Sequence, residues 1–249
     1  VTCGACSACK SGRDNLCPER MIISMPPREG AFAQFISMRG ENLVTVPEHV
    51  SLDAASLAEP IACGWHTVRL AKEALSSSAK TALVIGGGAI GLGAALSLSA
   101  QGVSVVTIVE PNALRRDVLN TQCGQTTISP DDLSADAMFD LVIDGVGYAA
   151  TRATASAHTR PGGVIGHIGL GEGKGGLDVR RMTLQEITFI GTYTYTAQDF
   201  RDTAAAIFDG RLGTLDWTEQ RPLSDGASAF SDILAGLTAA PKIILNPHI

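Results

Sequence analysis

The chain has 249 residues, enough for one large domain or two small ones with a sizeable core. Its 45% hydrophobic and 18% charged residues exclude a disordered chain, and a net charge of −6 argues against nucleic acid or an anionic membrane as the main partner. Apolar runs are broken by Gly and Ser before they reach the length of a membrane span, and no signal-peptide pattern is present. We expect a globular protein, with a cytoplasmic location as the default.

The region before residue 80 is expected to contain short elements only. Alternating polar and apolar residues predict short strands over 31–46. Asp53 is expected to cap a short helical run that Pro60 interrupts, and apolar spacings of three and four predict a helix over 61–75. The polar tract SSSAK at 76–80 is interpreted as a linker.

From residue 81 onward, strand and helix patterns alternate. The expected strands are 81–86, 103–110, 126–128, 139–144, 164–168 and 186–191, and the expected helices are 90–100, 113–122, 148–157 and 196–209. The tail adds a helix over 225–237 and a last strand, KIILN. Strands that alternate with helices in this way predict an α/β fold with a doubly wound parallel sheet.

The first expected strand runs into a glycine turn of the form G-x-G-x-x-G. The turn and helix start that would contact a cofactor are Gly86, Gly88, Ala89, Ile90 and Gly91. The first glycine allows a tight turn, the second lets the backbone approach a pyrophosphate, and the third allows close helix–strand packing. An α/β domain with this turn and no dinucleotide is the alternative.

The second expected strand ends on an acid, Glu110, where a carboxylate can accept a hydrogen bond from the ribose 2′-hydroxyl. The same carboxylate would repel a 2′-phosphate, which favours NAD over NADP. Arg115 and Arg116 keep NADP open, because an arginine past the acid can either pack on adenine or hold a 2′-phosphate.

Ligands of doubly wound sheets lie outside the carboxyl ends of the strands. We therefore expect further cofactor contacts in the turns after three later strands, from Val146, Ile168, Gly169, Thr192 and Tyr193. The run GLGEGKGG at 169–176 is interpreted as a flexible loop near the cleft, although its composition fits a plain surface loop equally well.

Four of the six cysteines lie within the first seventeen residues, at Cys3, Cys6, Cys9 and Cys17. The spacing C-x2-C-x2-C-x7-C lets four thiolates converge on one ion, and four thiolates suit a closed tetrahedral zinc site. An iron–sulfur cluster and paired disulfides are the other interpretations of this spacing.

Three segments together carry a family resemblance. The loop CGACSACKSGRDNLC, the stretch from GAFAQF to IACGWHTV and the turn VIGGGAIGL occur in an order and spacing that resemble the zinc-containing medium-chain alcohol dehydrogenases, especially the sorbitol, galactitol and threonine dehydrogenase branch. The resemblance implies an incomplete GroES-like β domain over 1–75, a Rossmann dinucleotide-binding domain over 76–212 and a return to the first domain over 213–249. It also implies structural zinc in the cysteine loop, against the iron–sulfur interpretation.

One departure from the family concerns catalysis. The family's catalytic zinc is held by a Cys and a His N-terminal to the cysteine loop, which begins here at residue 3. We therefore expect an N-terminally incomplete chain that is inactive alone. The resemblance leaves Glu59 as the catalytic, metal-proximal acid, with a helix-end carboxylate as the alternative. Cys63 is a second candidate ligand, although a buried small side chain is favoured there. His66 could line the nicotinamide end, but we favour a structural role for it.

The remaining histidines, His158, His167 and His248, are also expected to be structural.

The resulting hypothesis is reversible oxidation of a secondary alcohol or polyol by NAD, with zinc as both structural and catalytic metal. A non-catalytic dinucleotide-binding module and a zinc-independent reductase of the same superfamily are the alternatives. The family usually forms dimers or tetramers, so we expect a homodimer or homotetramer that pairs through the sheet edge near 187–195.

Overall fold

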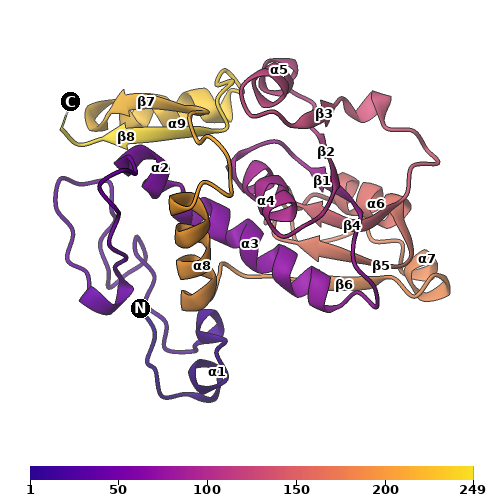
Figure 1. The fold of residues 1–249 in the computed structure, drawn as a ribbon, viewed down its shortest axis with the longest axis horizontal. Helices are drawn as coiled ribbons and strands as arrows, with labels where there is room; N and C mark the ends of the chain where they lie inside the picture. The colour runs from indigo at the N-terminus through magenta and orange to yellow at the C-terminus, as the bar shows by residue number, and fades with distance from the viewer. Residues whose placement is uncertain (249) are drawn as a thin grey trace.

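The computed structural model describes residues 1–248, and within them the centre of the fold is one six-stranded sheet of order β3-β2-β1-β4-β5-β6 (Figure 1). Every neighbouring pair in this sheet is parallel. The strands are β1 (Thr81–Ile85), β2 (Val105–Val109), β3 (Thr126–Ile128), β4 (Phe139–Asp144), β5 (Thr159–His167) and β6 (Thr188–Gly191). The order reverses at β1, so the doubly wound α/β prediction is confirmed.

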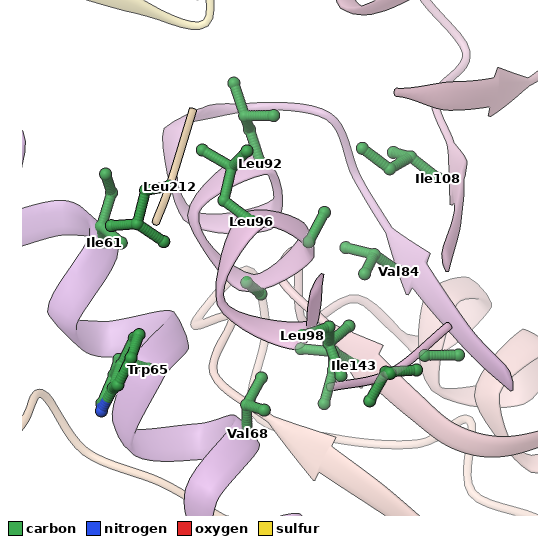
Figure 2. Packing of buried hydrophobic residues seen from close by; sticks show 14 of the residues in the cluster. Ile61, Trp65, Val68, Val84, Leu92, Leu96, Leu98, Ile108, Ile143 and Leu212 are labelled. Atoms are coloured by element: carbon green, nitrogen blue, oxygen red, sulfur yellow. The ribbon is translucent and has the colours of Figure 1, made fainter. Parts of the chain in front are cut away.

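Six helices accompany this sheet within residues 58–208, namely α3 (Ala58–Glu73), α4 (Ala89–Ala100), α5 (Ala113–Thr121), α6 (Ala149–His158), α7 (Val179–Leu184) and α8 (Ala197–Phe208). Helix α3 packs against both α4 and α8, whereas α6 packs against β4 and β5. Figure 2 shows Trp65 of α3, Leu96 of α4 and Val84 of β1 in the core between these layers. Within residues 1–248, no helix has both the length and the apolar character needed to cross a bilayer.

The close approach of α3 to α4 depends on glycine. A Cβ added at Gly64 would lie 2.5 Å from the backbone N of Ala94, and one added at Gly93 would lie 3.0 Å from the Cα of Ile61. The helix backbones therefore touch where Gly64 and Gly93 face each other. Helix α3, which the expected boundary at residue 75 assigns to the first domain, is fastened in this way to the dinucleotide-binding sheet.

The chain outside this sheet has little regular structure. Before α3 it forms α1 (Ser7–Lys10), η1 (Asp14–Leu16), η2 (Gly40–Asn42) and α2 (Leu52–Ser56), and after α8 it forms β7 (Thr218–Pro222), η4 (Leu223–Asp225), α9 (Gly226–Leu234) and β8 (Lys242–Asn246). Strands β7 and β8 pair in parallel and make a second, two-stranded sheet. A further short turn, η3 (Pro130–Asp132), follows β3.

The prediction of strands over 31–46 is wrong, since the structure describes this range in full and places no strand in it. Alternation specifies a strand only when a neighbouring strand takes up its backbone hydrogen bonds. Phe35 illustrates the result, because its side chain is 89% exposed.

The boundaries of other elements also differ from expectation. Helix α2 is capped by the Ser51 hydroxyl and not by Asp53, and Pro60 lies inside the first turn of α3, where proline is tolerated. Strand β5 begins at Thr159, five residues before the expected strand over 164–168, and α7 and β7 are not among the expected elements. The expected last helix is shorter, because Gly236 adopts a positive φ of 70°.

A buried polar cluster joins α3 to the start of α8. His66 Nδ1 donates to Asp199 Oδ2 at 2.7 Å, Arg69 Nε donates to Asp199 Oδ1 at 2.8 Å, and the Thr196 hydroxyl donates to Asp199 Oδ2 at 2.6 Å. Burial disfavours the charge, yet these hydrogen bonds hold the pKa of Asp199 well below its usual range. His66 is 1% exposed, as expected of a structural histidine.

Gly64→Ala tests the contact between the helices. The added methyl group must push α3 away from α4, so the free energy of unfolding should fall by about 1–3 kcal/mol despite the better helix propensity of alanine. Chemical denaturation measures this change. Gly40→Ala is the matched control, because a Cβ there meets no atom of the described residues within 4 Å. Equal stability of Gly64→Ala and wild type would contradict the close approach.

Asp199→Asn should lower the free energy of unfolding at pH 7 by about 2–4 kcal/mol, because it leaves Arg69 and His66 without their carboxylate. The folded pKa lies below the unfolded value, so the charged carboxylate stabilises the fold above about pH 4 and loses this effect as the pH falls toward the folded pKa. The difference between variant and wild type should therefore shrink at pH 3 in urea titrations.

Asp209→Asn is the control for this series, because Asp209, at the C-terminal end of the same helix, forms only an exposed ion pair with Arg211. A deficit of Asp199→Asn that stayed constant from pH 7 to pH 3 would be inconsistent with the assigned role.

Candidate dinucleotide and metal sites

A cavity of about 800 Å³ opens beside the glycine turn. It lies at the carboxyl ends of β1, β2 and β4, where doubly wound sheets bind their ligands. Eight of the residues predicted to contact cofactor line it, namely Gly86, Gly88, Ala89, Ile90, Gly91, Glu110, Arg115 and Val146. The structure thus gathers residues from three segments of the sequence around one space.

The three glycines of the turn occupy three different environments. Gly86 has a φ of 94°, and a Cβ on it would lie 2.4 Å from Val146 Cγ2. A Cβ on Gly91 would lie 1.8 Å from the carbonyl oxygen of Gly86, whereas one on Gly88 would meet no described atom within 4 Å. The first and third glycines therefore serve the turn and its packing, and the second leaves open space where a pyrophosphate can approach the backbone.

Glu110 is 4% exposed and faces the glycine turn from the end of β2. Its Oε2 accepts a hydrogen bond from Gly87 N at 2.7 Å, and its Oε1 accepts one from Asn112 N at 2.8 Å. These bonds fix the carboxylate at the edge of the cavity, with the Arg115 guanidinium 3.8 Å away. A carboxylate held there accepts hydrogen bonds from hydroxyl groups and repels phosphate.

The two arginines after Glu110 have different surroundings. Arg116 donates to the carbonyl oxygens of Glu110 and Pro111 at 2.8 Å each and does not line the cavity. Arg115 lines the cavity and donates to the Thr238 carbonyl at 3.2 Å, while its buried Nε has no hydrogen-bond partner in the described part of the chain. Of the two, Arg115 is therefore placed to contact a bound nucleotide.

Other residues of the cavity wall were not predicted. Pro111 and Tyr148 follow predicted residues closely, so the turn pattern could have indicated them. Pro130, Leu133, Thr154 and His158 come from the β3–β4 connection and from α6, which only the tertiary structure brings to the cavity. His158 Nδ1 donates to the Ala137 carbonyl oxygen at 2.9 Å, so this histidine makes a structural contact and also lines the cavity.

Four predicted contact residues lie outside this cavity at the ends of β5 and β6. Ile168 packs against the core, and Gly169 abuts Val146, since a Cβ there would lie 2.1 Å from the Val146 carbonyl carbon. Thr192 Oγ1 lies 2.6 Å from Thr67 Oγ1, and the Tyr193 carbonyl accepts a hydrogen bond from Asn15 at 2.8 Å. All four remain proposals as cofactor contacts.

Hydrogen bonds from helix α6 anchor the glycine-rich run 169–176. Arg152, 6% exposed on α6, donates to the carbonyl oxygens of Gly175 at 2.6 Å, Gly147 at 2.8 Å and Glu172 at 3.0 Å. The Glu172 side chain in turn accepts a hydrogen bond from Ala149 N. One buried guanidinium thus connects this run to the turn after β4, which favours the alternative of a plain surface loop.

The four N-terminal cysteines form a compact cluster. The Sγ atoms of Cys3, Cys6, Cys9 and Cys17 all lie within 4.8 Å of one another. A tetrahedral zinc–thiolate site has Zn–S distances of about 2.3 Å, which correspond to S···S separations of about 3.8 Å. Small side-chain movements would bring the four sulfurs to those separations, so the donor set and its geometry fit zinc.

Backbone groups prepare this cluster for thiolates. Ala5 N and Cys6 N donate to Cys3 Sγ at 3.4 and 3.3 Å, and these hydrogen bonds lower the pKa of Cys3 to about 6. Desolvation and the neighbouring Cys6 thiol raise the pKa of Cys9 to about 11. Ionisation is therefore favoured at Cys3 and disfavoured at Cys9, where a bound cation would compensate the charge of the thiolate.

Glu59 lies exposed in the first turn of α3, close to two protonated groups. Burial, followed by the Glu59 charge, raises the pKa of Cys63 to about 12, and Cys63 Sγ is 3.8 Å from the Glu59 carbonyl oxygen. Burial, Glu59 and Cys63 also raise the pKa of Tyr195 well above its usual range. Cys63 is thus a buried, unreactive thiol, in line with the interpretation favoured from sequence.

Among the residues that the structure describes, the cysteine cluster is the only group of three or more potential metal ligands. Glu59 would therefore supply a single ligand to a catalytic metal, and the described residues around it do not make a metal site by themselves.

Comparison with known proteins agrees with this combination of sites. A sequence profile described as zinc-binding dehydrogenase matches residues 89–209. Sorbitol dehydrogenase of Bacillus subtilis (strain 168) is 30% identical over 205 residues, which are 78% of this chain and 57% of that protein. The chain spans 57% and 62% of the lengths of two of the curated relatives that it matches.

Solved structures share the fold. L-idonate 5-dehydrogenase of Escherichia coli K-12 superposes with a TM-score of 0.86 at 20% identity, over 98% of this chain and 72% of that chain. Acetophenone reductase of Geotrichum candidum NBRC 4597, solved in complex with NAD, superposes with a TM-score of 0.80 at 23% identity, over 96% of this chain and 69% of that chain. The sequence profile and the Bacillus subtilis relative, together with the cysteine cluster and the glycine turn, show that the chain belongs to the zinc-binding medium-chain dehydrogenase family.

Proposed function

We propose that the protein catalyses reversible oxidation of a secondary alcohol or polyol by NAD. The observation that carries the proposal is the cavity in which the glycine turn, Glu110 and Arg115 meet, in a chain that also holds a four-cysteine cluster. A pyrophosphate would lie over Gly88, with its charge toward the exposed N–H groups at the start of α4. Relatives that act on sorbitol and idonate support a polyol-like substrate.

The preference for NAD rests on Glu110. Its carboxylate is fixed by Gly87 N and Asn112 N, so it cannot move away from a 2′-phosphate without breaking two hydrogen bonds. The hydroxyl of an NAD ribose would instead donate to it. Arg115 would pack against the adenine, since its guanidinium lies beside Glu110 and the charges already pair.

The zinc of the cysteine cluster would be structural. Cys3, Cys6, Cys9 and Cys17 would take all four positions of a tetrahedral ion and leave none for substrate. Four reduced thiols at one site also fit a reducing compartment, and on that ground we propose a cytoplasmic location. The division into segments 1–75, 76–212 and 213–249 remains part of the proposal.

For the chemical step, the protein's contribution is binding and orientation. Glu59 would provide one ligand to a catalytic zinc, which when bound supplies Lewis-acid stabilisation of the substrate oxygen. Ile168, Gly169, Thr192 and Tyr193, at the ends of β5 and β6, would place the nicotinamide for hydride transfer, and the hydride chemistry itself belongs to the cofactor. Strand β6 is an edge of the sheet, and we propose that it pairs with a second copy in a homodimer or homotetramer.

Glu110→Gln should change cofactor selectivity. The amide keeps the shape of the side chain but loses its charge, so NADH should bind about tenfold more weakly while the relative affinity for NADPH rises. Fluorescence titration with both cofactors measures the ratio, and Glu48→Gln is an exposed control with an unchanged ratio. Tighter binding of NADPH than NADH by the wild type would overturn the assignment of NAD.

Cys17→Ser should release the metal of the cysteine cluster and destabilise the protein, because three thiolates cannot close a tetrahedral site. Emission spectrometry of the purified protein should show the loss of about one zinc per chain. Cys123→Ser, which changes a cysteine far from the cluster, should keep the wild-type zinc content. Iron with labile sulfide in the wild type would exclude the zinc assignment.

Glu59→Gln tests the enzyme activity. A protein that also carries the Cys and His zinc ligands expected N-terminal to the cysteine loop should reduce NAD in the presence of sorbitol or another polyol and lose this activity on chelation. In that protein Glu59→Gln should lower kcat/KM by at least about tenfold while NADH affinity stays unchanged. Glu19→Gln is the exposed control. Cofactor binding without turnover of any alcohol would instead favour the non-catalytic dinucleotide-binding module.

A further inference from the structure

The turn from β6 into α8 is held by residues of the cysteine loop (residues 3–17). Asn15, 6% exposed, donates through Nδ2 to the Tyr193 carbonyl at 2.8 Å. Both Asp14 carboxylate oxygens accept from Ala197 N at 3.2 Å, at the first residue of α8. In Figure 1 the indigo lobe with α1 accordingly lies at the end of α8 where that helix begins.

The held turn, Thr192–Thr196, needs external support. Thr194 has a φ of 46°, in the left-handed region that a β-branched residue rarely adopts. The contacts of Asn15 and Asp14 fall on either side of it, at Tyr193 and Ala197. The surrounding contacts thus fix a conformation that this backbone would not adopt on its own.

The orientation of the Asn15 amide is determined by its partners. The Tyr193 carbonyl can only accept, so the amide nitrogen must face it, and the same nitrogen lies 3.5 Å from His66 Nε2. His66 Nδ1 donates to Asp199, and in the tautomer that carries its proton on Nδ1 the other ring nitrogen, Nε2, is an acceptor. One side chain of the cysteine loop therefore contacts both α3 and the turn.

The cysteine loop, in turn, takes its shape from its thiols. Asp14 and Asn15 lie in η1, a single turn between Cys9 and the buried Cys17. Within this loop, only Asn15 and Cys17 are buried, so a bound ion would be a main source of rigidity. Arg20 extends the same contact, since its guanidinium lies 4.9 Å from the centre of the Tyr193 ring.

We propose that Asp14 and Asn15 are positioning residues that transmit occupancy of the four-cysteine site to the turn Thr192–Thr196, and so to the nicotinamide end of the cofactor site. The inference rests on the proposed dinucleotide and zinc sites. Thr192 and Tyr193 then bind the nicotinamide half well only when the cysteine loop is ordered by its metal. The adenosine half, held by the glycine turn and Glu110, is independent of that loop.

The test compares NADH with ADP-ribose, which lacks only the nicotinamide. Asn15→Leu keeps the number and branching of the side-chain heavy atoms and removes both donated contacts. It should weaken NADH binding about three- to tenfold, change ADP-ribose binding less than about twofold, and retain zinc. Asp14→Asn should give a smaller change in the same direction, because it keeps an acceptor without its charge. Arg13→Ala, an exposed neighbour, is the control and should bind both ligands like the wild type.

A double-mutant cycle measures whether the cysteine site acts on the turn through Asn15. Cys9→Ser, which disables the metal site alone, should reproduce the selective loss of NADH affinity, and the double variant with Asn15→Leu should lose no more than either single variant. Hydrogen exchange of zinc-loaded Asn15→Leu should be faster at Tyr193–Ala197 and unchanged at the glycine turn. This second measurement also holds if Cys9→Ser does not fold.

The outcomes separate the two proposals. Wild-type protein that binds neither NADH nor ADP-ribose would refute the proposed function. Wild-type binding of both, with Asn15→Leu unchanged or weakened equally for both ligands, or with additive losses in the double variant, would refute the transmission while the proposed function stands.

Discussion

The close contact between α3 and α4 is the constraint on which the other features depend. Gly64 and Gly93 let the two helix backbones touch, and this contact fixes α3 against the sheet that carries the glycine turn. Helix α3 bears Glu59 in its first turn, His66 in its middle and Thr67 beside Thr192. A shift of α3 by the width of a methyl group would therefore move Glu59, His66 and Thr67 together, since packed interiors transmit such displacements.

The buried carboxylates near the contact between α3 and α4 each accept several hydrogen bonds. Asp199 receives hydrogen bonds from His66, Arg69 and Thr196, and Glu110 receives two backbone N–H groups. Arg152 shows the reverse arrangement, in which one buried cation satisfies the carbonyl oxygens of a glycine-rich loop. A buried charge without hydrogen-bond partners is costly in low-dielectric surroundings, so each of these groups needs its full set of partners. The hydrogen bonds thereby fix the turn or loop that supplies them.

The cysteine cluster and the dinucleotide cavity lie in separate parts of the fold, and a short path of polar contacts leads from the cysteine loop to the turn after β6 and to α3. The path runs from η1 through Asn15 to Tyr193 and His66. These contacts give the cysteine loop a role beyond its own stability, because Asn15 supports the turn after β6. The exposed apolar side chains of 31–46 contrast with this, since no strand of the described chain pairs with that stretch and it makes only scattered contacts, such as that of Phe32 with Phe230.

The sequence by itself determined the features that depend on neighbouring residues. Strands β3 and β4 were predicted to the residue, because turn residues and apolar runs delimit them locally, and the glycine turn, Glu110 and the cysteine cluster were predicted from spacing alone. Only the tertiary structure decided which segments meet. The pairing of His66 with Asp199, the place of His158 in the cavity wall, the anchoring of loop 169–176 by Arg152 and the lack of strands over 31–46 all depend on partners distant in the sequence or on their absence from the described residues. Local patterns specify backbone preference and burial, whereas a hydrogen bond or a strand forms only when the fold brings its second partner within reach.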